Sequence, residues 1–245
     1  MAINERHNSI LSILKKNRTA NVKELAKKLF VSEATVRRDL TEMKRLGLVE
    51  RSHGGAILPD NAKEISLFVR MSENSREKEI AATNALPHIP EFRTVFIDSS
   101  STALALAERM ELSFKTVVTN NLQTAIQLSK KRDVNLIILG GSVQYNTVSA
   151  TGSFTARQIE EFSFDLMICS CAAVKGNEVY ERSLEQREIK NAARKRSKCC
   201  ILLFDSTKYN GCGAYKSGNL SDFDAVFSDS LPADIQDVEE SNIIC

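Results

Sequence analysis

The chain has 245 residues, of which 42% are apolar and 26% are charged, and its formal net charge is +2. This apolar content is enough to bury cores, so the composition predicts a soluble globular protein of one or two domains and argues against a disordered chain. Apolar stretches stay shorter than the roughly 18 residues of a membrane span. Residues 1–16 lack the apolar block of a secretory signal, so we expect a cytoplasmic protein that does not contact membranes.

The six cysteines fit the same compartment, in which thiols stay reduced. No two of them form a C-x-x-C pair and none has a histidine nearby, so the spacing of a metal site is missing. We expect small buried side chains, no metal site and no cofactor. The six residues are Cys169, Cys171, Cys199, Cys200, Cys212 and Cys245.

The charge is unevenly distributed along the chain. Residues 1–57 contain twelve Lys or Arg and six Asp or Glu, a net charge of +6, and the remaining 21 basic and 25 acidic residues give −4. A basic head is typical of a protein that binds a polyanion, although a basic segment can also be a solvated face. A polar stretch that begins at Pro59 predicts a linker over residues 59–75, between domains at residues 1–58 and 76–245.

The basic head has the pattern of a winged helix-turn-helix domain. A first helix is predicted near the amino terminus, where apolar residues recur at helical spacing. Asn21 and Glu24 have the spacing of a capping box at the start of a second helix. Ser32 is the expected N-cap of a third helix that ends before Gly47, and apolar segments around a later glycine pair predict the strands of a wing. The inner face of the third helix is predicted to contain Val36, Leu40 and Met43.

A third helix that follows a tight turn is the element that such domains place in the major groove of DNA. Its predicted outer face is basic, and arginine can bond bidentately to guanine or phosphate. Backbone N–H groups at the helix start also attract phosphate. The alternative is a solvated basic hairpin that packs on a partner protein. The expected DNA-binding residues are Ser32, Glu33, Thr35, Arg37, Arg38, Thr41, Arg51 and His53.

Short apolar runs alternate with helical patterns in the acidic body. This alternation predicts an α/β domain with a mainly parallel sheet that helices cover on both faces. In such sheets a ligand lies at the carboxyl ends of the strands. The expected strands lie at residues 95–97, 117–118, 136–139, 166–168, 201–204 and 225–227, and the expected helices at residues 100–110, 122–130, 153–161 and 185–196.

Polar residues follow several of these strands and form a candidate small-molecule site. Hydroxyl side chains and N–H groups at the start of a helix suit a phosphate, and a lysine can add a point charge. Each feature alone is weak, because a serine run is more often a helix cap, a Gly-Gly pair a turn, and a lone lysine a solvated side chain. Because these features are expected at the same edge of one sheet, together they predict a site. Its residues are Asp98, Ser99, Ser100, Ser101, Thr102, Asn120, Gly140, Gly141, Lys190 and Lys208.

Several motifs resemble a known family. The runs VSEATVRRDL from Val31 and GLVERSHGGA from Gly47 are similar to the N-terminal domain of DeoR-type bacterial regulators, and the similarity continues through VVTNNLQTA from Val117 and LFDSTKY, which ends at Tyr209. The resemblance implies a regulator in which Ser32, Thr35, Arg37 and Arg38 face the operator. It also implies a C-terminal domain that is similar to ribose-5-phosphate and glucosamine-6-phosphate isomerases and senses a phosphorylated sugar. By position it assigns Asp98, Ser101, Thr102, Asn120, Lys190 and Lys208 to the effector pocket.

The chain departs from this family at positions where glycine is usual. Ser100 stands in place of a glycine after the first strand of the body, and the run from Ser170 to Ala173 replaces a Gly-x-x-Gly pattern. Because glycine permits positive φ and close approach of a ligand, we expect a reshaped pocket, with an unusual effector or weakened phosphate binding. Cys169 and Cys171 at this edge also suggest a redox sensor, as a lesser alternative.

The favoured function is a transcriptional regulator, most often a repressor of sugar or carbohydrate genes. It is expected to bind double-stranded operator DNA as a dimer or tetramer and to be released by a phosphorylated sugar, with activation as an open alternative. A second hypothesis is a sugar-phosphate isomerase with a DNA-binding head, in which Asp98 or Asp205 would be the general base. A third is an effector-independent regulator with a degenerate pocket. Because no acid–base constellation stands out, we do not expect an enzyme.

Overall fold

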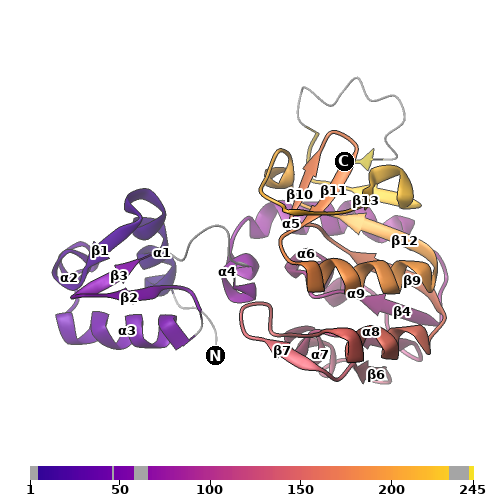
Figure 1. Cartoon of the computed structure of the whole chain (residues 1–245), viewed down its shortest axis with the longest axis horizontal. Coiled ribbons are helices and arrows are strands. Elements are labelled where there is room, and N and C mark those ends of the chain that lie inside the picture. Colours follow the sequence, from indigo (N-terminus) through magenta and orange to yellow (C-terminus); the bar gives the residue numbers. More distant parts are fainter. Residues whose placement is uncertain (1–4, 46, 58–65, 232–242) are drawn as a thin grey trace. The chain divides into compact units, whose positions relative to one another are not determined.

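The computed structural model describes residues 5–45, 47–57, 66–231 and 243–245. The chain divides into two compact units, residues 1–73 and 74–245 (Figure 1). Within the described residues, no helix is both long enough and apolar enough to cross a lipid bilayer.

The N-terminal unit is the predicted winged helix-turn-helix fold. Its small antiparallel sheet has the order β1-β3-β2, so β3 is the central strand. The predicted inner-face residues of the third helix are all fully buried in a core that the helices share with the sheet. The elements are α1 (Glu5–Asn17), β1 (Thr19–Asn21), α2 (Val22–Leu29), α3 (Glu33–Arg45), β2 (Glu50–Ser52) and β3 (Gly55–Ile57).

Local sequence signals account for the ends of α2 and α3. Asn21 and Glu24 form the predicted capping box, and the Asn21 side chain accepts a hydrogen bond from Glu24 N at 2.8 Å. Ser32 Oγ accepts one from Thr35 N at 3.1 Å and so caps α3. Gly47, which follows α3, has a φ of +67°, a conformation that glycine adopts at little cost. The predicted caps are therefore confirmed.

Strand β1 was not predicted, because three residues are too few for an alternating pattern to be recognised. It pairs with β3, and Ala20 lies opposite Ala56. A Cβ atom at Gly55 would overlap the carbonyl oxygen of Ala20. The close approach of β1 to β3 therefore depends on this glycine.

The segment predicted as a linker contains a helix. Residues 58–65 lie outside the described residues, and α4 (Leu67–Ser72) follows them. Val69 of α4 is buried with the core of the N-terminal unit, and Phe68 packs against that core. The prediction of a linker over residues 59–75 therefore missed the helix α4, because it was based on the polar residues that begin at Pro59.

The C-terminal unit is built around a seven-stranded sheet with the order β15-β14-β12-β9-β4-β5-β6. Every pair of neighbouring strands is parallel. All six predicted strands are present, so the predicted α/β class is confirmed, and β15 adds an unpredicted seventh. The strands are β4 (Thr94–Ile97), β5 (Thr116–Thr119), β6 (Asn135–Ile138), β9 (Phe164–Cys169), β12 (Ser197–Leu203), β14 (Ala225–Phe227) and β15 (Ile243–Ile244).

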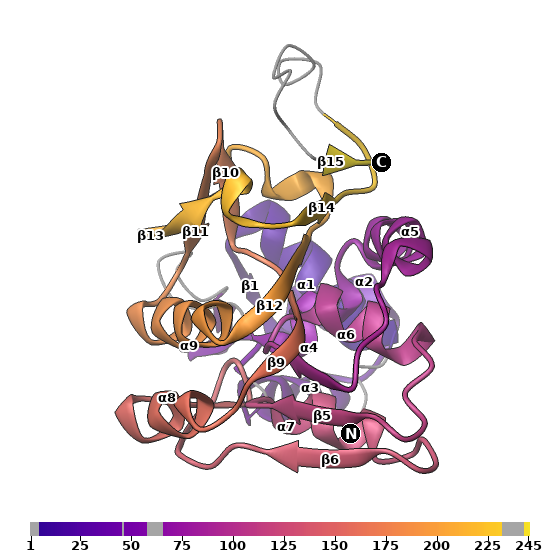
Figure 2. The same cartoon turned by 90° about the vertical axis from the view of Figure 1, so that its right-hand side faces the viewer.

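Helices cover both faces of this sheet (Figure 2). Ala82, Leu106 and Leu128 are buried from the helices on one face, and Ile159 and Ile189 from those on the other. The helices are α5 (Ser75–Ala85), α6 (Ser101–Arg109) and α7 (Leu122–Leu128) on the first face and α8 (Ser153–Glu160) and α9 (Leu184–Lys195) on the second, with 3-10 turns η1 (Leu86–His88), η2 (Ser206–Lys208) and η3 (Leu220–Asp222).

Two small antiparallel sheets flank the main sheet, a hairpin of β7 and β8 and a sheet with the order β10-β11-β13. They were not predicted, because their strands are too short to show alternation. Their bounds are β7 (Ser142–Gln144), β8 (Ser149–Thr151), β10 (Ala173–Lys175), β11 (Glu178–Glu181) and β13 (Tyr215–Asn219).

The strand order reverses between β4 and β9. From β4 the chain continues outward through β5 and β6, and it then returns to β9 on the other side of β4. The connections after β4 and β9 consequently lead away in opposite directions. This topological switch point is where open α/β sheets bind ligands. Asp98 follows β4 and Ser170 follows β9, so both lie at it.

Candidate DNA-binding surface and effector site

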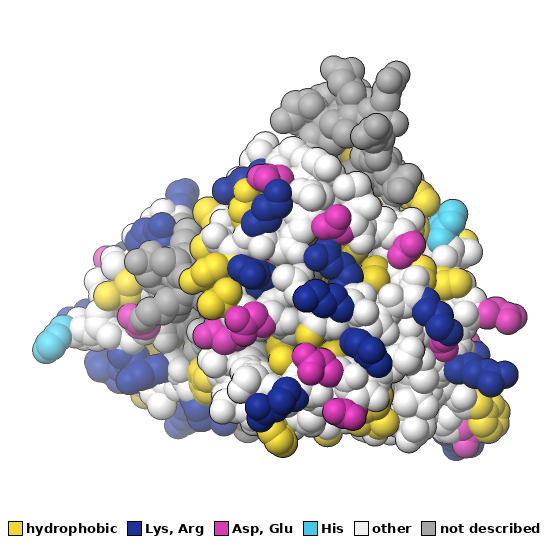
Figure 3. All heavy atoms as spheres, turned by 45° about the vertical axis from the view of Figure 1, so that its right-hand side comes forward, with side chains coloured by type: hydrophobic (Ala, Val, Ile, Leu, Met, Phe, Trp, Pro, Cys, Tyr) yellow, Lys and Arg dark blue, Asp and Glu magenta, His cyan; other side chains and the backbone are white. Residues whose placement is uncertain are grey.

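The outer face of α3 presents the predicted basic side chains. Arg37, Arg38 and Thr41 are exposed, and Lys44 extends the basic surface toward the helix end. Arg37 pairs with Glu33 at 3.0 Å, one turn earlier on the helix, and both side chains are about half exposed. Because an exposed pair contributes little to stability, Arg37 can exchange Glu33 for a phosphate at small cost. The face shown in Figure 3, in contrast, mixes basic with acidic side chains over the C-terminal unit.

The hydroxyl groups predicted for DNA contact have structural partners. Ser32 Oγ caps α3 and lies 2.9 Å from Thr35 Oγ1. Thr41 Oγ1 donates to the carbonyl oxygen of Arg37 at 2.8 Å. Arg38, in contrast, has no hydrogen bond or ion pair with the residues that the structure describes. Among the residues predicted to contact DNA, Arg38 therefore has a guanidinium group that can bind DNA without first giving up a partner among the described residues.

The two predicted wing residues differ in exposure. His53 lies exposed at the turn between β2 and β3, next to Gly54, whose φ is +77°. Arg51 is half-buried on β2, and its Nη1 atom is buried without a partner among the described residues. His53 is thus placed for contact outside the unit, whereas Arg51 is partly enclosed by it.

An ion pair that the sequence did not reveal fixes α3 against α1. Asp39 is 5% exposed and accepts two hydrogen bonds from the Arg6 guanidinium, at 2.5 and 2.8 Å. His7 Nε2 lies 3.6 Å from the same carboxylate. A bidentate guanidinium–carboxylate pair restricts geometry more than a single hydrogen bond does. It sets the orientation of the helix that carries Arg37 and Arg38.

In the C-terminal unit, Asp98 lies at the centre of the switch point. It is 1% exposed, and its Oδ1 accepts hydrogen bonds from Ser100 N at 2.9 Å and Ser100 Oγ at 2.5 Å. Its Oδ2 accepts one from Ser170 N at 3.2 Å. This single carboxylate therefore joins the loops that follow β4 and β9.

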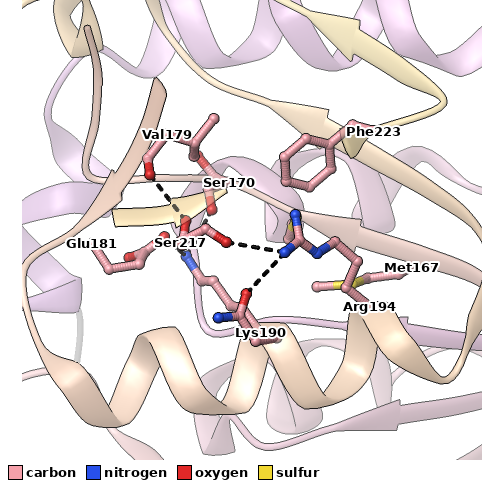
Figure 4. A pocket seen from close by; sticks show the side chains of 10 residues that line it. Met167, Ser170, Val179, Glu181, Lys190, Arg194, Ser217 and Phe223 are labelled. Carbon is pink, nitrogen blue, oxygen red and sulfur yellow. Dashed lines mark hydrogen bonds and ion pairs between the residues drawn. The ribbon is translucent and has the colours of Figure 1, made fainter. Parts of the chain in front are cut away.

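Lys190 reaches the switch point from α9 and is paired with two carboxylates, of which Figure 4 draws Glu181. Its Nζ atom lies 2.6 Å from Glu181 Oε1 and 3.1 Å from Asp98 Oδ2, and it donates to Ser170 O at 2.6 Å. Burial alone would lower the pKa of Lys190, but Glu181 and Asp98 outweigh it and hold that pKa above its ordinary value. Lys190 is therefore a charged, fully engaged counter-ion and not a free cation. Glu181 was missed, because β11 was not predicted.

A cavity of about 10 Å³ lies beside Lys190 and Glu181, between α9 and β9. That volume corresponds to roughly one water molecule. Arg194 and Phe223 are among the residues that line it. The cavity is too small for a sugar, so it does not serve as the effector site.

Gln186 is a second residue that the sequence did not single out. It lies on α9, is 4% exposed, and accepts a hydrogen bond from Ser99 Oγ at 2.8 Å. Its amide nitrogen donates to Ser149 Oγ at 2.8 Å and to Thr147 Oγ1 at 3.3 Å. One buried amide thus connects the serine loop, α9 and the β7–β8 hairpin. Only a contact between distant segments identifies this role.

The hydroxyl run after β4 forms the start of α6. Ser100 is the N-cap and accepts a hydrogen bond from Ala103 N at 3.1 Å. Ser101 and Thr102 belong to the first turn and are buried, at 7% and 1% exposure. The N–H groups of a first helical turn favour an anion. The run serves both as the helix cap and as a candidate phosphate cradle.

The remaining predicted site residues are spread along the sheet edge. Asn120 follows β5 and is fully buried; its Nδ2 donates to Ala150 O at 2.9 Å, and its Oδ1 has no partner among the described residues. Gly140 and Gly141 are exposed after β6, where Gln158 and Thr155 of α8 bond to Gly140. These glycines thus lie at the outermost strand, away from the switch point.

Lys208 lies in η2, after β12, and is half-buried. Within the described part of the chain, its ammonium group has no hydrogen bond or ion pair. Asp205, just before η2, is fully buried and accepts hydrogen bonds from Asn74 Nδ2 at 3.2 Å and from Thr207 Oγ1. Lys208 is therefore the predicted site cation that remains available.

The positions that depart from the family pattern do not need glycine here. Ser100 has a φ of −90°, and neither Ser170 nor Ala173 has a positive φ. Ala173 lies close to Gly211 and Gly213, where a Cβ atom would come within 3.4 and 3.5 Å of the Ala173 methyl group. The backbone at these positions therefore accepts side chains without a positive φ.

The expectation of buried cysteines is wrong for Cys212 and Cys245, which are exposed. Cys169 and Cys171 are buried, and burial raises the pKa of both thiols far above its ordinary value. A buried thiol without thiolate character is unreactive, so the structure gives no support to a redox sensor. Among the described residues, no group of three His, Cys, Asp or Glu side chains is arranged to hold a metal ion.

Comparison with known proteins gives two family matches. Residues 6–62 match the DeoR-like helix-turn-helix domain, and residues 73–230 match the DeoR C terminal sensor domain. The chain is similar to the lactose phosphotransferase system repressor of Streptococcus mutans, with 35% identity over 83% of each chain. It is also similar to the glycerol-3-phosphate regulon repressor of Escherichia coli, with 30% identity over 93% of this chain and 91% of the relative.

Among solved structures, the chain is similar to ribose 5-phosphate isomerase A of Methanocaldococcus jannaschii. The identity is 12%, the TM-score is 0.41, and the match covers 56% of this chain and 55% of the isomerase. The two family matches together span both units of the chain. The isomerase hypothesis is therefore set aside, and the chain belongs to the DeoR family of DNA-binding transcriptional regulators.

Proposed function

We propose that this chain represses genes of sugar or carbohydrate metabolism and leaves its operator when a phosphorylated sugar binds to the C-terminal unit. The observation that carries the DNA-binding part is the exposed basic face of α3, with Arg38 unpaired among the described residues. The two relatives named above are repressors of a lactose and a glycerol-3-phosphate system, which supports carbohydrate genes as targets.

In this proposal, residues 1–58 bind the operator and residues 76–245 bind the effector and assemble a cytoplasmic dimer or tetramer. α3 enters the major groove, with Arg37 and Arg38 at base edges or phosphates. The N–H groups near Ser32 and the wing residue His53 hold the DNA backbone. Effector binding must favour an arrangement of the paired heads that does not fit the two half-sites.

For the effector, we propose that the phosphate lies at the start of α6, near Ser101 and Thr102, with Lys208 as its counter-ion. Lys190 already pairs with two carboxylates, which neutralise its ammonium group. This supports Lys208 as the cation that binds the phosphate. The sugar hydroxyls then face Asp98 and Gln186, whose oxygen and nitrogen atoms suit them.

A second candidate is an effector-independent regulator, and one observation favours it. Ser100 Oγ already occupies the N–H group of Ala103 and bonds to Asp98. At this position the family usually has glycine. In this chain the Ser100 hydroxyl occupies space, and accepts the hydrogen bond from Ala103 N, that a bound phosphate would otherwise use. Binding of sugar phosphates to the purified protein separates the two candidates.

The operator contact is tested with Arg38→Ala. The substitution is expected to weaken operator affinity about 5- to 150-fold, as loss of one arginine contact costs roughly 1–3 kcal/mol. Fluorescence anisotropy at fixed salt, with a duplex selected from a random pool by the wild-type protein, measures the loss. Lys16→Ala on α1 removes a comparable exposed charge and is expected to change affinity much less. Equal affinity of Arg38→Ala and wild type would remove α3 from the interface.

The effector is tested by release of the same duplex in the presence of pentose, hexose and triose phosphates. At least one compound is expected to release the wild-type protein, and Lys208→Ala is expected to need a higher concentration of it while binding the free duplex normally. The thermal unfolding midpoint should rise with the same compound. If no compound releases the duplex or shifts the midpoint, the effector-independent candidate is favoured. An unchanged titration for Lys208→Ala would exclude Lys208 from the site.

A further inference from the structure

β6 is an edge strand of the main sheet. Its sequence lacks the residues that usually prevent an edge strand from pairing with another chain. Among the described strands, β6 pairs only with β5, so one side of its backbone has no strand partner. Its residues, Asn135 to Ile138, include no charge and no proline. Monomeric proteins usually block such an edge with a charged residue, a proline or a bulge. The opposite edge of the sheet is closed by the two-residue strand β15.

Large apolar side chains are exposed around this edge. Five of them are each about half exposed, and they come from β6 and from the elements next to it. Together they present on the order of 500 Å² of apolar surface, the size of the largest patch on a typical monomer, which is often functional. We call these residues and β6 the apolar edge; the five are Ile126 (56% exposed), Ile138 (46%), Val143 (54%), Tyr145 (57%) and Phe154 (58%).

The apolar edge extends over both faces of the sheet. Leu136 belongs to the core beneath α7, and Ile137 packs with the core beneath α8. By the alternation of a strand, Ile138 lies on the same face as α7, which carries Ile126. Phe154 comes from α8 on the other face, where a Cβ atom at Gly140 would lie 3.6 Å from its ring. Figure 2 shows β6 at the margin of the sheet, near α7 and α8.

We propose that a second copy of this chain docks on the apolar edge, with β6 antiparallel to β6 of the partner about a two-fold axis. The two sheets then form one continuous sheet, and the exposed apolar side chains of each copy cover those of the other. With the backbone of the edge strand, this surface approaches the roughly 800 Å² per partner of a standard interface.

The charge pattern fits a copy of the same chain. A two-fold interface places a surface against itself, so any charge near the axis would face its like. β6 has no charge, and an antiparallel register with Ile137 opposite the partner's Ile137, on the two-fold axis, places residues 131–133, which are charged, against residues 141–143, which are not. The pairing therefore brings no like charges together. This inference concerns assembly and does not depend on the identity of the effector.

The test is the mass of the full chain in solution, measured by light scattering during size-exclusion chromatography. The wild-type protein is expected to run as a dimer or larger assembly at micromolar concentration. Ile138→Lys places a charge beside the axis, where it meets its own copy, and should raise the dissociation constant of this contact by at least 100-fold. Because Ile138 is 46% exposed, the folded chain can accept lysine there.

Ile80→Lys is the matched control. Ile80 is 38% exposed on α5, a helix that contacts β12 and β14, far from β6 in the strand order. This variant should keep the wild-type mass. Hydrogen exchange provides a second measurement, since the amides of β6 should exchange faster in Ile138→Lys than in the wild type. A monomeric wild type at high concentration, or an Ile138→Lys variant with the wild-type mass and the wild-type exchange of β6, would overturn the proposal.

Discussion

The ammonium group of Lys190 is held in the interior by two carboxylates. Asp98 and Glu181 both pair with it. Burial makes an uncompensated charge costly, because water cannot replace the missing partner. At the scale of single residues, Lys190 therefore stabilises the switch point and fixes the direction of the Asp98 carboxylate.

Removal of this cation is expected to be strongly destabilising. Lys190→Met removes the ammonium group that pairs with two buried carboxylates and should lower the free energy of unfolding by about 3–5 kcal/mol. Urea unfolding of the full chain at pH 7 measures the change.

The matched control is Lys198→Met. Lys198 pairs with Asp165 at 2.8 Å, but its side chain is 74% exposed. Loss of an exposed pair costs at most about 1 kcal/mol. Equal losses for the two variants would show that the Lys190 cluster is no more important than a surface ion pair.

Among the site residues, those that directly follow an apolar run could be predicted from the sequence. Asp98 is such a residue, because the apolar residues 95–97 of β4 end immediately before it. Glu181 and Gln186 could not be predicted in the same way. Their roles depend on contacts with Lys190 and Ser99, and no local pattern encodes the contact between Gln186 and Ser99, which are 87 positions apart.

At the scale of elements, the wing depends on how closely β1 and β3 approach. Gly55 lies opposite Asn21, and the Ala20 carbonyl oxygen occupies the space that a side chain at Gly55 would need. The neighbouring Gly54 has the opposite character: its φ is +77°, and nothing lies within 4 Å of the position of a Cβ atom. One glycine is required by space and the other by backbone conformation.

These two glycines give a paired prediction. Gly55→Ala should force β1 away from β3 and destabilise the N-terminal unit by roughly 1–3 kcal/mol, as overpacking typically does. Gly54→Asn should cost much less, because asparagine tolerates positive φ. Thermal unfolding followed by circular dichroism measures both, and operator affinity should fall with Gly55→Ala alone. A larger loss for Gly54→Asn would contradict this account of the wing.

At the scale of the whole molecule, the main sheet could be predicted because its parallel strands are buried on both faces and appear as short apolar runs. The caps at Asn21, Ser32 and Gly47 were predictable for a similar reason, since the residues that form them are close in sequence. The small sheets and β15 were not, because two to five residues are too few for a periodic signal. The helix α4 was not predicted, because the polar residues before it led to the prediction of a linker over the whole segment.

The pairing of β4 with β9 has a consequence for the order in which the protein forms. Asp98 and Ser170, which meet at the centre of the sensor, are 72 positions apart, whereas Arg6 and Asp39 in the head are 33 apart. Contacts between distant positions close slowly, and a ribosome completes the head first. A chain whose synthesis stops before β9 would therefore contain the helix that we propose to enter the major groove, and would lack the proposed effector site. Under that proposal, such a fragment would meet the operator with a single head and would not respond to the effector.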